Sequence, residues 1–319
     1  MIPTILVIGD IIIDRYIRGT STRLSPEAPV PVIDISTEYV THSLGGAGNV
    51  AANIAALGGT VRLVGVVGYP EPDLPVFDLM TDIYTGGVYR ATDRPTSRKT
   101  RIIANNQQVA RLDREVSYDA DTTAQSVITH CVDCYAKDSQ AIVVSDYAKG
   151  VITPFTMTNI CRIAGERKLP LFVDPKVRHK EYYKSKHITA MTPNVHEVVG
   201  LSASSIQNSN ANTLARNILA YYSHEYLLVT EGDKGMSLYG NLRWSVERSE
   251  YESDVQHIHT EARNVFDVSG AGDTVIATLA FEYAKHQDMS SAVRVANKAA
   301  GIVVGKRGTA VITSDELYK

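Results

Sequence analysis

Residues 267–275 read Asp267-Val-Ser-Gly-Ala-Gly-Asp273-Thr-Val and place a glycine-rich turn, a carboxylate and the start of an apolar segment next to one another. Gly270 and Gly272 have no Cβ, so the backbone of this turn can come close to a ligand. The apolar run over residues 274–281 predicts a buried helix. The free N–H groups and the positive dipole end at the start of such a helix favour a bound anion. The stretch therefore predicts a phosphate site at a helix N-terminus.

Asp273 is unusual in this position, because a carboxylate repels the phosphate beside it. It is expected there if it accepts the proton of a hydroxyl that attacks the phosphate. The alternative is that Ser269 or Asp273 caps the helix and that the glycines only make a tight turn. Taken alone, the stretch is compatible with both interpretations.

A second glycine cluster, Gly45-Gly46-Ala47-Gly48-Asn49, precedes an alanine-rich run and predicts a second loop-to-helix ligand site. Its spacing also fits the dinucleotide-binding fingerprint. That fingerprint should directly follow the first strand of a βαβ unit, whereas the strand-like run 5–13 lies far upstream. A P-loop is excluded as well, because Gly301-Ile-Val-Val-Gly305-Lys306 is one spacer short and is followed by Arg307.

Together, in this order along the chain, the two glycine stretches resemble the N-terminal and C-terminal signatures of the ribokinase-like (PfkB) sugar kinases, the second of which usually reads Asp-Thr-x-Gly-Ala-Gly-Asp. The resemblance runs from about residue 4 to residue 313. Within the family it looks closest to the kinases that phosphorylate D-glycero-D-manno-heptose 7-phosphate at O1. The further matching segments are 9–16, 23–32, 99–101, 111–113, 145–150, 173–176 and 192–197.

Two segments depart from the family pattern. After Gly68 the family usually has Asp-x-x-Gly and a full helix, but the prolines of residues 69–75 would delay any helix to about Phe77. Lys176 is followed by Val-Arg-His, where the most similar members tend to have Gly-x-Asp. We therefore expect a remodelled segment at 69–80 and altered contacts around Lys176.

Composition agrees with a soluble enzyme, and we expect a cytosolic location. The chain has 319 residues, a net charge of -3 and three cysteines. This charge predicts neither a nucleic-acid partner nor an anionic membrane partner, and so few cysteines fit a reducing compartment. No apolar run reaches the roughly 18 residues that span a bilayer, and the N-terminus lacks the basic flank of a signal peptide.

Strand-like and helical runs alternate along most of the chain, which predicts an α/β fold with a largely parallel sheet and helices on both faces. The expected strands are 5–13, 141–145, 171–173, 188–191 and 226–230, and the expected helices are 122–135, 155–166, 213–222, 271–285 and 292–304. Residues 30–40 and 89–112 instead show short alternating runs typical of antiparallel strands. The resemblance implies one three-layer α/β/α kinase domain over residues 1–319, with a small β lid from about 15–42 and 88–114.

The resemblance also assigns roles in ATP binding and phosphoryl transfer. Asp273 would be the base, and the N–H groups of Gly270, Ala271 and Gly272 would hold the transferring phosphoryl group. Asn194 and Glu197 would organise Mg²⁺, mostly through water, and Asp267 would help to bind a monovalent cation such as K⁺. The residues implied for the nucleotide are Thr230, Gly232 and Asn297. On spacing alone, Asn194 and Glu197 read as a helix cap with its N3 partner.

For the sugar, the implied contacts are Asp14, Gly45, Gly46 and Asn49, since a polyol needs paired donors and acceptors that a glycine loop can bring close. Asp14 could instead be an ordinary turn acid. The 7-phosphate needs cations, and Arg111 and Lys176 are the preferred candidates. The other candidates are Lys99, Arg101 and Lys149, and we expect only two or three of the five to touch the phosphate.

The expected function is thus ATP-dependent phosphorylation of a heptose 7-phosphate to the 1,7-bisphosphate, on the route to the ADP-heptose of lipopolysaccharide, by a homodimer. No His-x-Gly-His motif of a nucleotide-transferring domain occurs among the nine histidines, so we expect this kinase step alone. The alternatives are another sugar, sugar-phosphate or nucleoside kinase of the family, a non-catalytic sugar-phosphate sensor, and, last, a dinucleotide oxidoreductase.

Overall fold

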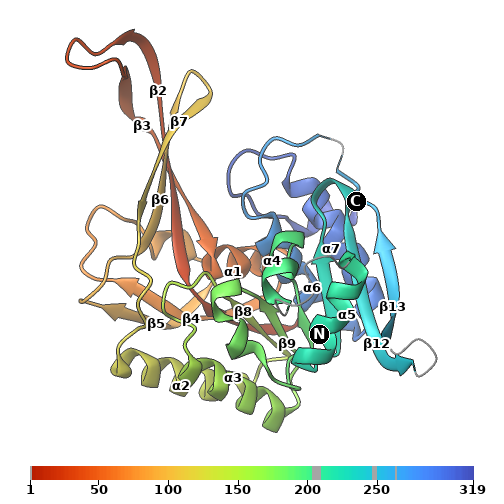
Figure 1. The fold of residues 1–319 in the computed structure, drawn as a ribbon. Coiled ribbons are helices and arrows are strands. Elements are labelled where there is room, and N and C mark those ends of the chain that lie inside the picture. Colours follow the sequence, from red (N-terminus) through yellow and green to blue (C-terminus); the bar gives the residue numbers. More distant parts are fainter. Residues whose placement is uncertain (1, 203–209, 246–249, 263) are drawn as a thin grey trace.

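The computed structural model describes residues 2–202, 210–245, 250–262 and 264–319, and these form a nine-stranded sheet and a separate four-stranded sheet (Figure 1). The large sheet has the order β13-β12-β11-β10-β9-β8-β1-β4-β5. Pairing is parallel from β11 to β5, and only β12 and β13 are antiparallel additions at one edge. Its strands are β1 Thr4–Gly9, β4 Thr60–Gly68, β5 Tyr84–Ala91, β8 Ala141–Ser145, β9 Leu171–Asp174, β10 Ala190–Met191, β11 Tyr226–Thr230, β12 Met236–Ser245 and β13 Glu250–Ile258.

Helices cover both faces of the large sheet because its central strands are apolar on both sides. Along β1, Ile5 and Val7 lie in one core cluster and Leu6 and Ile8 in the other, the alternation that a pleated strand imposes. The first cluster contains residues of α1 Ala47–Ala56, α6 Ala271–His286 and α7 Met289–Val303. The second contains residues of α2 Thr122–Ala136, α3 Pro154–Arg167, α4 Val195–Leu201 and α5 Ala211–Tyr222. The predicted three-layer α/β/α class is confirmed.

The four-stranded sheet has the order β3-β2-β6-β7 and extends away from the large sheet as a long arm (Figure 1). Its strands are β2 Ile11–Leu24, β3 Pro31–Gly46, β6 Ser97–Ala104 and β7 Gln107–Arg114. The segments 15–42 and 88–114, expected to form a lid, lie mostly in this sheet. Residues 88–91 do not, because they pair with β4 at the edge of the large sheet.

The single strand predicted over residues 5–13 is wrong. The chain leaves the large sheet at Asp10, whose N–H donates to the Ser145 carbonyl, and Ile11 then pairs with Gly46 in the small sheet. In the segment with the prolines, only a 3₁₀ turn, η1 Asp78–Met80, follows Phe77, as predicted. The other short helices in the described ranges are η2 Val177–Tyr183, η4 Gly232–Lys234 and α8 Ser314–Tyr318.

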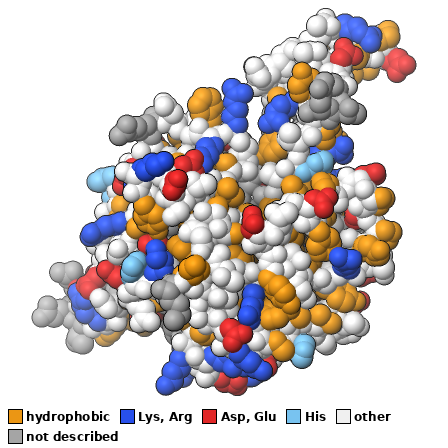
Figure 2. Space-filling model, turned by 180° about the vertical axis from the view of Figure 1, so that it is seen from behind, with side chains coloured by type: hydrophobic (Ala, Val, Ile, Leu, Met, Phe, Trp, Pro, Cys, Tyr) orange, Lys and Arg blue, Asp and Glu red, His pale blue; other side chains and the backbone are white. Residues whose placement is uncertain are grey.

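The surface is mixed in character. Seen from behind, Lys and Arg side chains alternate with Asp and Glu, and apolar side chains lie between them (Figure 2). Among the described residues, no helix combines the length and apolar character needed to cross a bilayer.

Candidate active site

The N-terminus of α6 is made by the predicted glycine turn. Gly270 is the N-cap residue and has a φ of 80°, a left-handed conformation that glycine adopts without strain. No side chain caps this helix, so the interpretation of Ser269 or Asp273 as a cap is wrong. The N–H of Ala271 donates to the Val268 carbonyl at 3.2 Å, so this one of the three predicted anion-hole donors is engaged within the turn.

The carboxylate of Asp273 lies in the first turn of α6 and is only 3% exposed. Its Oδ2 accepts a hydrogen bond from Asn49 Nδ2 and its Oδ1 accepts one from the Tyr147 hydroxyl, both at 2.9 Å. Burial raises the pKa of Asp273 to about 6, although both hydrogen bonds act to lower it. An acid with this pKa is ionised at neutral pH and can accept a proton.

The second glycine stretch packs directly against the first. A Cβ on Gly270 would lie 2.6 Å from Asn49 Nδ2, and a Cβ on Gly45 would lie 2.7 Å from Asp14 Oδ2. Gly46 is the N-cap of α1 and has a φ of 55°. The two loop-to-helix turns that the sequence singled out thus meet at one site, and Asn49 joins them through its bond to Asp273.

The four-stranded sheet contributes charged side chains from one of its faces. Asp14 on β2 lies beside Lys99 on β6, which lies beside Asp113 on β7. Two positions further along, Tyr16, Arg101 and Arg111 form the neighbouring row of the same face. Asp14 is therefore a strand residue and the turn-acid alternative is wrong.

Most charges of this face already have partners within the chain. Asp14 is ion-paired with Arg101 and accepts a hydrogen bond from Thr309 Oγ1 at 2.9 Å. Arg111 pairs with Asp113 at 2.9 Å, and half of its side chain is exposed. Lys99 Nζ lies 5.4 Å from the centre of the Tyr147 ring, within range of a cation–π contact. Lys149 pairs with Glu115, so among the five candidate cations Lys149 and Arg101 are the most firmly held in carboxylate pairs.

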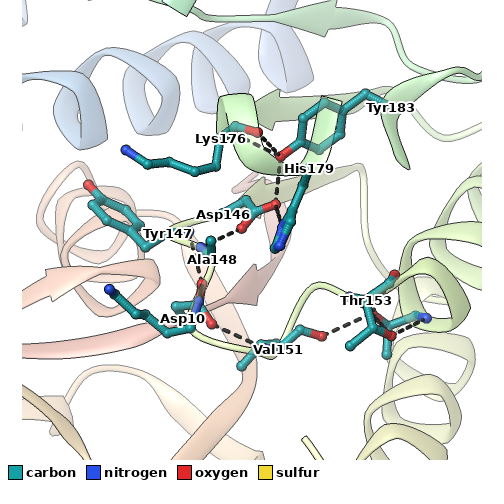
Figure 3. Close-up of polar contacts among 11 residues, drawn as sticks. Asp10, Asp146, Tyr147, Ala148, Val151, Thr153, Lys176, His179 and Tyr183 are labelled. Carbon is teal, nitrogen blue, oxygen red and sulfur yellow. Dashed lines mark hydrogen bonds and ion pairs between the residues drawn. The ribbon is translucent and has the colours of Figure 1, made fainter. Parts of the chain in front are cut away.

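The loop after β8 is fixed by two buried carboxylates (Figure 3). Asp10 accepts hydrogen bonds from the backbone N–H groups of Tyr147, Lys149 and Val151. Asp146 accepts from the N–H of Ala148, from Tyr183 and from His179. Burial, and then the Asp146 carboxylate, raise the pKa of Asp10 to about 6.

The altered segment after Lys176 is part of this network. His179 lies 2.8 Å from Asp146 Oδ2 through its Nδ1. Tyr183 OH accepts a hydrogen bond from the Lys176 N–H at 2.8 Å. The side chains of Tyr147 and Lys176 extend to the same side (Figure 3). The backbone of Lys176 is thus held by Tyr183, which shares Asp146 with His179.

A cavity of about 680 Å³ lies beside the α6 N-terminus, between it and the ends of β11 and α7. It is lined by the residues expected to hold the nucleotide, Thr230, Gly232 and Asn297, and also by Ala271 and Gly272. The Asn297 amide donates to the His259 carbonyl, which leaves its oxygen for other contacts. The sequence did not single out the apolar wall of this cavity, formed by Val265, Val268, Val275, Ala300 and Val304. Val265 and Val268 are about two-thirds exposed and suit a flat aromatic base.

A smaller cavity of about 220 Å³ adjoins the larger one and shares Asn194, Thr230 and Gly272 with it. Tyr147, Asp174, Lys176 and Glu197 line its remaining wall. Burial, and then the carboxylates of Asp273 and Glu197, raise the pKa of Asp174 well above its usual range. A cation bound here would relieve this crowding of carboxylates.

Asn194 and Glu197 form a capping box at the start of α4, as their spacing alone suggests. Glu197 Oε2 accepts from the Asn194 N–H at 3.0 Å, while Oε1 lies 4.0 Å from Lys176 Nζ. Among the described residues, no three His, Cys, Asp or Glu side chains are grouped as a metal cage. The side chains of Asn194 and Glu197 suit Mg²⁺, which keeps several waters and binds through one or two carboxylates and the substrate phosphates.

Asp267 links the turn before α6 to the C-terminal segment. Its Oδ1 accepts from the Ser269 N–H at 2.9 Å and its Oδ2 from the Gly308 N–H at 3.2 Å. Each oxygen keeps a further lone pair for a cation.

The chain is similar in sequence to known proteins over almost its whole length. Residues 3–316 match the family model described as pfkB family carbohydrate kinase. The chain is 39% identical to the "Bifunctional protein HldE" of Granulibacter bethesdensis over 98% of its own length and 64% of that protein. It spans less than two thirds of the length of the curated relatives it matches.

Solved structures share the fold. The phosphofructokinase-2 of Escherichia coli in complex with potassium superposes with a TM-score of 0.76 at 14% identity, covering 99% of this chain and 97% of that one. The ribokinase of Arabidopsis thaliana complexed with ribose and ATP superposes with a TM-score of 0.71 at 17% identity, covering 100% and 98%.

Proposed function

From the premise that this chain belongs to the pfkB family of carbohydrate kinases, we propose that it transfers the γ-phosphoryl group of ATP to O1 of D-glycero-D-manno-heptose 7-phosphate. The observation that carries this proposal is the placement of Asp273. Its buried carboxylate follows Gly272, which lines both the large apolar cavity and the small acidic one. It is also hydrogen-bonded to Asn49 of the second glycine turn, an expected sugar contact. A proton acceptor between the cavity proposed for ATP and the expected sugar contacts is what a direct transfer between two substrates requires.

In this mechanism the O1 proton of the sugar passes to the carboxylate of Asp273. The O1–phosphorus bond forms as the bond from the γ-phosphorus to the β–γ bridging oxygen breaks, and ADP leaves. The N–H groups and the dipole at the start of α6 stabilise the negative charge of the transferring group. Positioning and charge stabilisation suffice for phosphoryl transfer, so no covalent enzyme intermediate is required.

Two cations complete the proposed site. Glu197 and Asn194 would hold Mg²⁺ through water at the small cavity, where the ion would neutralise phosphate charge. Asp267 would help to hold a monovalent cation such as K⁺ beside the α6 turn. Thr230, Gly232 and Asn297 would contact ATP, with its base on the apolar wall of the larger cavity.

The acceptor sugar would lie between the α6 turn and the charged face of the small sheet. Asp14, Gly45, Gly46 and Asn49 would contact the sugar hydroxyls. Arg111 and Lys99 are the favoured cations of the sheet for the 7-phosphate, and Lys176, which lines the smaller cavity, is the third candidate. The partly exposed Arg111–Asp113 pair supports this choice, because Arg111 can exchange Asp113 for a phosphate at little cost.

The small sheet would act as a lid that closes over the sugar and excludes water. We also propose that the protein forms a homodimer through its lids and that it is located in the cytosol.

The proposal is tested by measuring ADP release with ATP and Mg²⁺ across a panel of acceptors. The panel contains heptose 7-phosphate, fructose 6-phosphate, ribose and adenosine. The largest kcat/KM is expected with heptose 7-phosphate. A preference for another acceptor would reassign the substrate within the family, and no turnover with any of them would favour a sensor.

A further inference from the structure

The hydroxyl of Tyr147 contacts the carboxylate of Asp273, and nothing in the expected phosphoryl-transfer chemistry requires this contact. Tyr147 comes from the loop after β8, whereas Asp273 comes from α6, more than a hundred positions later in the chain. The phenol donates to Oδ1 and Asn49 donates to Oδ2, so each oxygen of the carboxylate is held by one donor from a different element. A carboxylate held in this way has one orientation relative to α6.

Tyr147 is itself fixed from both sides. Its backbone N–H donates to Asp10 at 2.8 Å, and the next peptide is held by Asp146 through the N–H of Ala148. The left-handed φ of 54° at Ala148 shows how tightly this turn is constrained. On the lid side, Lys99 lies over the Tyr147 ring. A side chain with this support can position another group.

We infer that Tyr147 is a positioning residue that holds the proton acceptor Asp273 in the orientation needed to receive a proton from the acceptor sugar. Each carboxylate oxygen has a lone pair left after its bond to Tyr147 or Asn49, and one of these lone pairs receives the proton. The phenol stays protonated, because desolvation and the Asp273 carboxylate raise the pKa of Tyr147 well above its usual range. Tyr147 is therefore a donor to Asp273 at neutral pH.

Several other charged groups also interact with Asp273. Asp14 on β2 raises the pKa of Asp273 and Lys99 on β6 lowers it, while Asp174 at the end of β9 interacts with Asp273 electrostatically. The hydrogen bonds from Asn49 and Tyr147 are the largest influences that lower the pKa of Asp273. Removing one of them alone shifts the titration of this carboxyl upward.

Tyr147→Phe removes the hydroxyl and keeps the ring beneath Lys99. The matched control is Tyr318→Phe on α8, where a tyrosine hydroxyl also donates to a carboxylate, that of Glu282 at 2.5 Å, in the C-terminal half of α6 and away from the turn that carries Asp273. Carboxyl ¹³C signals are followed against pH in aspartate-labelled protein, and the Asp273 signal is assigned by its loss in Asp273→Asn. In parallel, kcat and kcat/KM are measured against pH with ATP and heptose 7-phosphate.

In Tyr147→Phe, the titration midpoint of Asp273 and the acid limb of kcat/KM are expected to rise together by about one pH unit, the scale of one hydrogen bond to a charged group. We also expect kcat on the pH plateau to fall by about tenfold to a hundredfold, because the carboxylate loses its fixed orientation. Tyr318→Phe is expected to match the wild type in both readouts.

An unchanged ¹³C midpoint in Tyr147→Phe would overturn the inference, and so would a shifted midpoint with unchanged kcat and acid limb. The inference rests on the proposed role of Asp273 in phosphoryl transfer, and the two can fail separately. A shifted ¹³C midpoint in a protein that turns over none of the acceptors would retain the contact between Tyr147 and Asp273 and reject the proposed function.

Discussion

Ionisation of Asp273 lowers the free energy of unfolding. The pKa of this carboxyl is about 6 in the folded chain and 3.8 in an unfolded chain. The folded protein binds this proton more tightly than the unfolded chain does. The stability contributed by the group is thus full below pH 3.8 and is lost as the pH rises through 6. Two pKa units correspond to a loss on the order of 3 kcal/mol at neutral pH. Such a loss of stability is typical of a group whose perturbed pKa serves catalysis.

We predict that Asp273→Asn lowers kcat by at least about a hundredfold, the usual scale of a general base, while ATP binding is retained. The free energy of unfolding should rise by about 1 to 3 kcal/mol at pH 7 and change little at pH 4, where wild-type Asp273 is already protonated. Urea unfolding at both pH values and steady-state kinetics check this. Retention of most of the kcat would remove Asp273 from the mechanism.

The acid limb of kcat/KM for the wild-type protein is predicted to lie near pH 6, because activity requires the ionised carboxylate of Asp273. The sign follows from the protonation state: activity is lost as the pH falls below 6. A pH–rate profile at constant ionic strength measures this. An acid limb at the ordinary Asp value near 4 would contradict the burial that the structure describes.

Gly270 and Gly272 give a matched pair of tests in the same turn. An added Cβ at Gly270 would meet Asn49 at 2.6 Å with a backbone already at positive φ, whereas at Gly272 it would meet nothing within 4 Å. Gly270→Ala is therefore predicted to lower the free energy of unfolding by about 1 to 3 kcal/mol. Gly272→Ala is predicted to keep the stability and to raise the KM for ATP, because the added methyl group would enter the cavity proposed for ATP. Equal stability losses in thermal unfolding would contradict this distinction.

At the scale of elements, β7 presents two arginines on its two faces. Arg111 shares the face of Asp14 and Lys99, and Arg114, paired with Glu71, lies on the other. We predict that Arg111→Gln raises the KM for heptose 7-phosphate by roughly tenfold or more, the scale of one charge-assisted contact, and leaves the KM for ATP unchanged. Arg114→Gln is the control on the same strand. If both substitutions had the same effect, the charged face would not be the phosphate site.

The sequence predicted the elements unevenly, for physical reasons. The helices 122–135 and 271–285 were located to within a residue, since apolar periodicity and turn residues mark them. The antiparallel strands β12 and β13 were not predicted, because their mixed, half-exposed composition gives a weak pattern. The break of the run 5–13 at Asp10 was not visible either, since both halves are equally apolar and only the partner strands differ.

The same division holds for the candidate site. The glycine turns and Asp273 were marked by local sequence and family signatures, and the structure brings them together. Tyr147, Thr309 and the apolar cavity wall were not singled out, because their roles arise from contacts between residues far apart in the chain. Whether Arg111 and Lys176 hold a phosphate stays a prediction.

At the scale of the whole molecule, the central claim is that the two glycine turns, Asp273 and the two adjoining cavities form one site for transfer from ATP to a sugar 7-phosphate. The most direct measurement is the product of incubating the protein with ATP, Mg²⁺ and D-glycero-D-manno-heptose 7-phosphate, identified by mass spectrometry and ³¹P NMR. The account predicts equimolar ADP and heptose 1,7-bisphosphate, with a new phosphorus signal coupled to the proton on C1. Unchanged heptose 7-phosphate, or a second phosphate on any carbon other than C1, would contradict it.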